Sequence, residues 1–137
     1  FLGAITARLD ALDAQVFLAY TPDHGENMLD DVRGLTLHAL KRPTLWETRV
    51  PLVGWSSRAW RAAHADRWAQ LENNVDAALM HMDVVPTLLG AAGVQFDEHR
   101  TLPIDLTRGK VPARTRFTQV RPGETVTFEA LLREAGR

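Results

Sequence analysis

Apolar residues in this chain recur either in short runs or at helical spacing, and the two patterns alternate along most of the sequence. The run at 16–21 predicts a buried strand that ends before Pro22, because proline cannot donate to a sheet ladder. A second strand is predicted at 49–55. Helical spacing predicts three amphipathic helices, over 2–13, 58–71 and 75–92.

The pattern changes after Val94. Alternating residues at 114–120 and 125–128, separated by a proline–glycine turn, predict a β-hairpin that leads into a short helix. Between Glu26 and Thr48 the apolar residues show neither helical spacing nor strand-like alternation, so this stretch is predicted to be a loop. Loops longer than ~15 residues in a compact domain are usually functional or disordered, which directs attention to its polar residues.

The amino-acid composition mainly excludes certain kinds of site and partner. The 137 residues are 45% hydrophobic and 24% charged, which is ordinary for a soluble globular domain. We predict one domain over 1–137, with core αβ units at 1–95 and a C-terminal extension at 96–137. A net charge of -1 argues against a nucleic-acid partner, and the lack of cysteine excludes disulfides and thiolate sites. The chain begins at Phe1 without an initiator methionine, and we expect it to be cut from a longer polypeptide.

Candidate chemistry begins where the first predicted strand ends. Asp23 and His24 stand side by side there, and Gly25 permits a tight backbone turn. A carboxylate oxygen and a neutral imidazole nitrogen suit a divalent metal, and zinc most of all. A catalytic zinc takes at least three protein ligands, so this pair would be half of a site. The residues alone leave open the alternative that Asp23 forms a turn and His24 is a surface residue.

Four further residues in or near the predicted loop and helices carry ionisable groups of interest. Glu26 is placed to orient a metal-bound His24 by accepting a hydrogen bond from its other ring nitrogen, or else is a solvated loop carboxylate. His38 lies among apolar residues, where a histidine more often has a structural, hydrogen-bonded role than a functional one. Lys41 is able to meet a phosphate or sulfate oxygen, although solvated charge is its default. A structural role is favoured for His81.

Three segments together resemble the sulfatase-like members of the alkaline phosphatase superfamily. Residues 20–27 (YTPDHGEN) resemble their second metal-binding motif, 47–56 (ETRVPLVGWS) their next core strand, and 81–94 (HMDVVPTLLGAAGV) the helix that follows. Each motif is weak by itself, whereas three in the same order are specific. The resemblance implies an α/β fold: the C-terminal part of a three-layer α/β/α sandwich, with a small β-hairpin and helix near the C-terminus.

Within the superfamily, residues 30–38 look most like the phosphoethanolamine transferase branch. That resemblance implies that Asp23 and His24 are zinc ligands and that His38 binds the phosphoryl group. It also implies a periplasmic domain of an inner-membrane-anchored parent, which moves phosphoethanolamine from a phospholipid donor to a glycolipid acceptor. The alternative is a sulfatase or phosphodiesterase, with calcium in a sulfatase and Lys41 as the substrate-binding residue. A non-catalytic domain that retains the fold is a third possibility.

The chain departs from the family pattern in ways that affect the expected activity. The nucleophile of these enzymes, a threonine in the transferases, lies in the N-terminal half, and no threonine here has the matching context. The periplasmic disulfides of the transferases are missing as well. We therefore expect the N-terminal half of the parent as a partner and an inactive fragment without it. A sheet that lacks its neighbouring strands would expose an edge, which predicts self-association.

Overall fold

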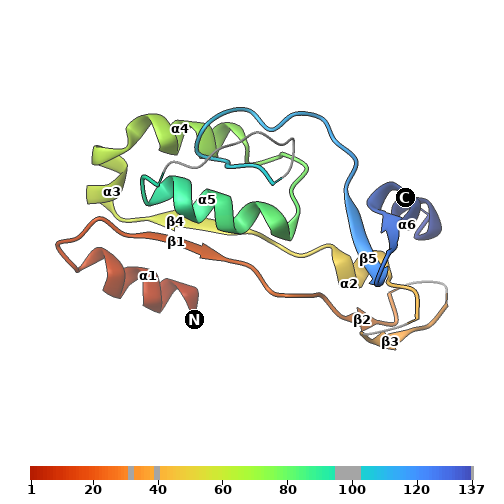
Figure 1. The fold of residues 1–137 in the computed structure, drawn as a ribbon. Helices are drawn as coiled ribbons and strands as arrows, with labels where there is room; N and C mark the ends of the chain where they lie inside the picture. The colour runs from red at the N-terminus through yellow and green to blue at the C-terminus, as the bar shows by residue number, and fades with distance from the viewer. Residues whose placement is uncertain (31–32, 39–40, 95–102, 137) are drawn as a thin grey trace. The chain divides into compact units, whose positions relative to one another are not determined.

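The computed structural model describes residues 1–30, 33–38, 41–94 and 103–136, which form a mixed fold of helices and small sheets (Figure 1). The chain divides into two compact units that interleave along the sequence. Unit 1 comprises Phe1–Tyr20 and Val53–Ala113, and unit 2 comprises Thr21–Leu52 and Arg114–Arg137. The predicted boundary between 95 and 96 lies outside the described residues.

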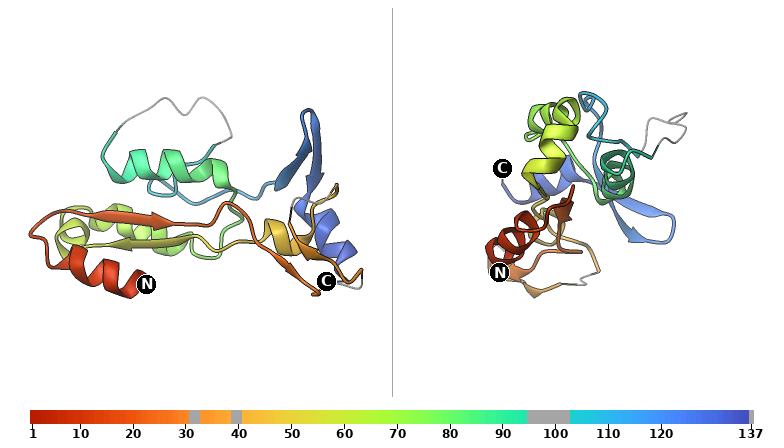
Figure 2. Two further views of the ribbon diagram at one scale, coloured as in Figure 1. Left: turned by 90° about the horizontal axis from the view of Figure 1, so that it is seen from below. Right: turned by 90° about the vertical axis from the view of Figure 1, so that its left-hand side faces the viewer.

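Unit 1 is built on a two-stranded antiparallel ribbon. Strand β1 (Phe17–Tyr20) pairs with β4 (Val53–Ser56), with Phe17 opposite Ser56 and Tyr20 opposite Val53. Strand β1 lies within the predicted run at 16–21, whereas β4 begins later than the predicted strand at 49–55 and continues past it to Ser56. Helix α5 (Val84–Ala91) packs against β1 and runs along the ribbon in Figure 1 and in the left view of Figure 2. The mixed α/β character predicted from the sequence is confirmed for this unit.

The helices of unit 1 lie in the predicted amphipathic stretches but differ in length, and the part of the predicted 75–92 helix over 75–80 is a turn and loop instead. Those described are α1 (Leu2–Asp10), α3 (Arg58–Ala63), α4 (Ala65–Asn73), the 3₁₀ turn η1 (His81–Asp83) and α5. The predicted helix over 58–71 divides at His64, whose backbone leaves the helical region with φ -134° and ψ 45°. The ring of His64 contacts Trp60, and its Nε2 lies 3.1 Å from Gln15 Oε1, so tertiary contacts hold this break.

Buried polar side chains anchor the loops of unit 1. Asp83 is fully buried, and its carboxylate accepts hydrogen bonds from Met80 N (2.8 Å) and Ile104 N (3.0 Å). Asn74 is also buried; its amide donates to Leu106 O and Gly109 O and accepts from Val111 N. A buried polar group is stabilising only when it is bonded in this way, and these bonds fix the stretch at 104–111 to the helices.

The indole of Trp60 joins three elements of unit 1. It is 3% exposed, its ring packs 5.1 Å from that of Phe17, and its Nε1 donates to Ala91 O at 3.1 Å. Ser57, which caps α3 by accepting from Trp60 N, sets the indole at the first turn of that helix. The ribbon, α3 and the end of α5 therefore share one packed aromatic residue.

Unit 2 contains β2 (Asn27–Met28), β3 (Thr36–Leu37), α2 (Leu45–Thr48), β5 (Phe117–Arg121), β6 (Glu124–Thr127) and α6 (Phe128–Glu134). The predicted C-terminal hairpin and helix are confirmed as β5, β6 and α6. The core of the unit is formed by Leu45, Val126 and Leu131. Within the predicted loop, β2 and β3 add a short antiparallel pairing, and α2 supplies one helical turn.

The described helices are all too short or too polar to cross a lipid bilayer.

Candidate metal centre

The loop that follows β1 opens with the predicted pair of metal ligands. Asp23 is exposed, and its Oδ1 accepts a hydrogen bond from His24 N at 3.2 Å. Its other oxygen, Oδ2, lies 3.8 Å from His24 Nε2. Two donors of one tetrahedral zinc are about 3.4 Å apart, since each bond is about 2.1 Å long. A small rotation of either side chain would thus bring this pair to one metal ion.

A backbone carbonyl determines which nitrogen of His24 is available. His24 Nδ1 lies 2.8 Å from Gly25 O. Because a carbonyl oxygen can only accept, Nδ1 carries the hydrogen of this bond. In the neutral imidazole the free lone pair is then on Nε2, the atom that faces Asp23. This is the arrangement of a metal-ligating histidine whose second nitrogen is held by the protein.

The structure brings His38 to the same place from β3. The ring centroids of His24 and His38 are 3.9 Å apart, with an angle of 33° between the planes. The Glu26 carboxylate accepts a hydrogen bond from His38 Nδ1 at 3.0 Å. One ligand atom from each of His24, Glu26 and His38 lies within 4.8 Å of the other two. We refer to these three residues as the His–Glu–His cluster.

Helix α2 provides the support behind Gly25. The Gly25 N–H donates to Glu47 O at 2.8 Å, and a Cβ at position 25 would overlap the Trp46 carbonyl oxygen. The close approach of two backbones is thus possible only with glycine. Thr44 caps α2 by accepting from Glu47 N, while the Glu47 side chain accepts from Thr44 N. This reciprocal capping box stabilises the first turn of α2, against which the loop that carries His24 packs.

The chemistry of the cluster fits a divalent metal ion. Two imidazole nitrogens and carboxylate oxygens are donors that zinc prefers, and all the side chains involved are exposed. Movements of about 1 Å would bring the donor atoms from their present separations to those of a coordination sphere. Asp23 and His24 fit as direct ligands. Glu26 fits either as a ligand or as the group that orients His38.

The electrostatics of the loop favour protonated His24 in the metal-free protein. The pKa of His24 is raised above 6.5, chiefly by the hydrogen bond to the Gly25 carbonyl and further by the carboxylates of Asp23, Glu26 and Glu47. Desolvation, which is second in size to the Gly25 hydrogen bond, lowers the pKa and opposes this shift. Because zinc binds only the neutral ring, protons compete with the metal below this pKa.

We expect a measurable pH dependence from this shift. The raised pKa means that protonation of His24 stabilises the folded state below pH 6.5, and this contribution is lost as the pH rises through the folded pKa. NMR titration of the His24 ring without metal should give a midpoint above that of a histidine in an unstructured peptide. Zinc affinity should fall as the pH drops below the same midpoint. A midpoint at or below 6.5 would contradict the assigned bond to Gly25.

The other residues predicted from the sequence do not all lie where their predicted roles require. Glu26 contacts His38, whereas the sequence assigned its carboxylate to His24. Lys41 is exposed ahead of α2, and its role in substrate binding stays a prediction. His81 lies in η1 of unit 1, apart in sequence from the cluster. The contact of His38 with Glu26 was not predicted, and the sequence carries no local signal for it, because both residues lie in the stretch without helical or strand periodicity.

Comparison with known proteins identifies the family. The sequence profile of the Sulfatase family matches residues 1–94, which is most of the chain. The chain belongs to the sulfatase family. The matched stretch includes the Asp23–His24 pair and all three residues of the His–Glu–His cluster.

One curated relative of this sulfatase-family chain is the phosphoethanolamine transferase CptA of Salmonella typhimurium. The two are 32% identical over 88 residues, which is 64% of this chain and 15% of the relative. The chain therefore spans only a small part of the length of that protein. No solved structure matches this sulfatase-family chain.

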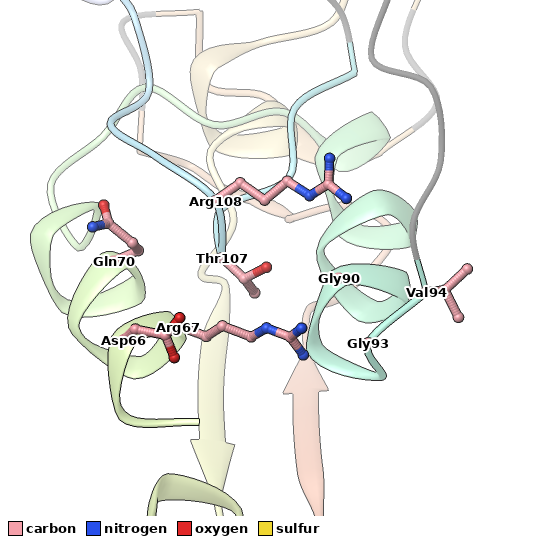
Figure 3. A pocket seen from close by; sticks show the side chains of 8 residues that line it. All are labelled: Asp66, Arg67, Gln70, Gly90, Gly93, Val94, Thr107 and Arg108. Carbon is pink, nitrogen blue, oxygen red and sulfur yellow. The ribbon is translucent and has the colours of Figure 1, made fainter. Parts of the chain in front are cut away.

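A concave site of a different kind lies in unit 1 of the sulfatase-family chain (Figure 3). Its volume is about 560 Å³, and it is lined by residues of α4, of α5 and the turn that follows it, and of the turn after Asp105: Asp66, Arg67, Gln70, Gly90, Gly93, Val94, Thr107 and Arg108. The side chains of Arg67 and Arg108 both extend toward α5 in Figure 3. This lining has one carboxylate and no histidine, so the donors for a metal ion are found in the His–Glu–His cluster instead.

Proposed function

We propose that this chain supplies part of the zinc centre of a phosphoethanolamine transferase. The observation that carries the proposal is the convergence of His24, Glu26 and His38. The similarity to a phosphoethanolamine transferase supports the choice of reaction. The sulfatase-family match over the same residues supports the choice of a metal-dependent enzyme.

The hydrogen bonds of each side chain indicate which of its atoms are available to the metal or to the substrate. His24 offers Nε2 to the metal, since its Nδ1 is engaged with Gly25 O. Asp23 adds a carboxylate oxygen beside that nitrogen. Bound zinc would contribute positive charge that polarises a nucleophile and stabilises the transferred phosphoryl group. His38 Nδ1 donates to Glu26, which leaves Nε2 for the metal or the transferred group: its lone pair can bind the metal, and in the doubly protonated ring its N–H can donate to a phosphoryl oxygen.

The rest of the reaction is assigned to residues outside this stretch. The nucleophile and further ligands would come from the N-terminal half of the natural polypeptide, because this chain spans 15% of the related transferase. A phospholipid donor, a glycolipid acceptor and a periplasmic location form part of the same proposal. The open edges of the β1–β4 ribbon are where we expect the remaining sheet, or a second copy of the fragment, to add strands.

Hydrolysis of sulfate esters is a second candidate function. The observation in its favour is the match to the Sulfatase profile along residues 1–94. Lys41 would then contact the sulfate, and calcium would replace zinc among the oxygen ligands. Calcium prefers six or more oxygen donors, whereas the His–Glu–His cluster contributes two nitrogens. The donor set thus favours zinc and the transferase.

Metal analysis of variants tests the proposal. The natural polypeptide that contains this sequence should purify with bound zinc, and His24→Ala should lower its zinc affinity by about 100-fold or more. His81→Ala, at an exposed histidine of unit 1, is the matched control and should retain wild-type zinc. Competition with a chromogenic chelator measures both.

Substrate assays then separate the candidate functions. Transfer from a phosphoethanolamine donor, lost in His24→Ala, would support the transferase, while turnover of p-nitrophenyl sulfate alone would favour the sulfatase. Absence of divalent metal from the wild-type polypeptide would overturn both and leave a non-catalytic domain.

A further inference from the structure

Asn27, the residue that follows Glu26, is buried although its neighbours are exposed. Only 2% of its surface is accessible. Its Nδ2 donates to Leu37 O at 2.7 Å, and its Oδ1 accepts from Thr44 Oγ1 at 2.6 Å. Both ends of the amide are thus used within unit 2. The bond to Leu37 joins the strand that follows Glu26 to the residue that precedes His38.

Leu37 has a backbone conformation that leucine seldom adopts. Its φ is 67°, and its side chain is 66% exposed, so packing of that side chain does not explain the conformation. A residue with a Cβ pays an energetic cost in the left-handed region, and something must hold it there. The bond from Asn27 to the Leu37 carbonyl is placed to do so. The resulting turn directs His38 toward Glu26 and His24.

Thr44 connects Asn27 to the support of the other histidine. Its hydroxyl donates to Asn27 Oδ1 and accepts from Glu47 N at the start of α2. The carbonyl of Glu47 in turn accepts from Gly25 N, next to His24. Both loops of the cluster are therefore fastened to one turn of helix, one through Gly25 and the other through Asn27.

We propose that Asn27 and Thr44 are positioning residues that hold His24 and His38 at metal-binding separation. This inference rests on the proposed metal-dependent function. Neither residue is itself a metal ligand. Both act through the backbone, Asn27 by its bond to Leu37 O and Thr44 by its bond from Glu47 N. Substitution of either residue should change the metal affinity and the coordination geometry. A variant that only destabilises unit 1 should change neither.

A pair of buried asparagines provides a matched test. Asn27→Leu in the natural polypeptide conserves volume and removes both hydrogen bonds, and it should lower zinc affinity by about 10- to 100-fold. Asn74→Leu makes the same change in unit 1, where the amide bonds Leu106 O, Gly109 O and Val111 N. It should lower resistance to urea while leaving zinc affinity unchanged. Visible spectra of the cobalt(II)-loaded proteins should differ from wild type for Asn27→Leu only.

Thr44 provides an independent test that is unaffected by poor folding of an Asn27 variant. Thr44→Ser retains the hydroxyl and should preserve zinc affinity and the cobalt spectrum. Thr44→Val is of the same size without the hydroxyl and should weaken zinc binding in the direction of Asn27→Leu. Equal zinc affinity in wild type, Asn27→Leu and Thr44→Val would overturn the positioning role alone. Failure of the wild type to bind zinc would instead overturn the proposed function.

Discussion

Gly25→Ala should abolish zinc binding and destabilise unit 2. The added Cβ would overlap the Trp46 carbonyl oxygen, which belongs to the backbone of α2 and cannot turn away as a side chain would. Either the loop or the helical turn must move, and the hydrogen bond from Gly25 N to Glu47 O is lost with that movement. Overpacking of this kind costs about 3 kcal/mol. The displaced loop carries His24, so the metal centre is lost together with the stability.

Two measurements on the natural polypeptide check this result. Urea denaturation gives the change in the free energy of unfolding, and chelator competition gives the zinc affinity. Gly54→Ala is the control, because a Cβ in β4 would make only an ordinary contact at 3.9 Å from Phe17 Cζ. It should bind zinc as tightly as wild type. Full zinc affinity in Gly25→Ala would show that α2 does not support the metal site.

Gly90→Ala should destabilise unit 1 despite lying in a helix. Alanine is favoured over glycine in α5 by about 1 kcal/mol, but its Cβ would overlap the carboxylate of Asp105. Asp105 is buried and already accepts from Thr107 N and Thr107 Oγ1 at 2.8 Å each, so it has no alternative position that keeps these bonds. The clash costs about 3 kcal/mol, which leaves a net loss of about 2 kcal/mol.

Gly3→Ala distinguishes this clash from helix propensity. Gly3 lies in α1, and a Cβ there would contact nothing within 4 Å. That substitution should be neutral or stabilising by up to about 1 kcal/mol, as judged from urea denaturation. Zinc affinity should be unchanged in both variants, because neither residue belongs to unit 2. A stabilised Gly90→Ala protein would mean that Asp105 does not approach α5 closely.

Together, the expected effects separate stability from metal binding. Variants at Gly90 and Asn74 should change the stability of unit 1 alone, while variants at Gly25 and Asn27 should change zinc affinity. This separation is possible because the metal centre and its supports all lie within 21–52. It also allows the proposed function to be tested independently of general folding defects.

The sequence determined the local elements of this protein and the identity of its chemical groups. Alternating residues and a Pro-Gly turn specified the hairpin of β5 and β6, because both the pairing and the turn are local in the chain. The run before Pro22 specified β1, which delivers Asp23 and His24 to a strand end. The order of three motifs indicated the family that the profile match confirms.

Only the tertiary structure decided how these groups are combined. The pairing of β1 with β4 and the break at His64 depend on contacts with residues distant in sequence. His38 joins Glu26 and His24 because a buried amide at Asn27 holds Leu37 in a left-handed turn. No local pattern encodes that bond, since it forms between a side-chain and a backbone atom that approach only when β2 and β3 have paired. The sequence singled out Asp23, His24, Glu26 and His38 one by one, whereas the contacts of His38 with Glu26 and His24 were decided by the tertiary structure.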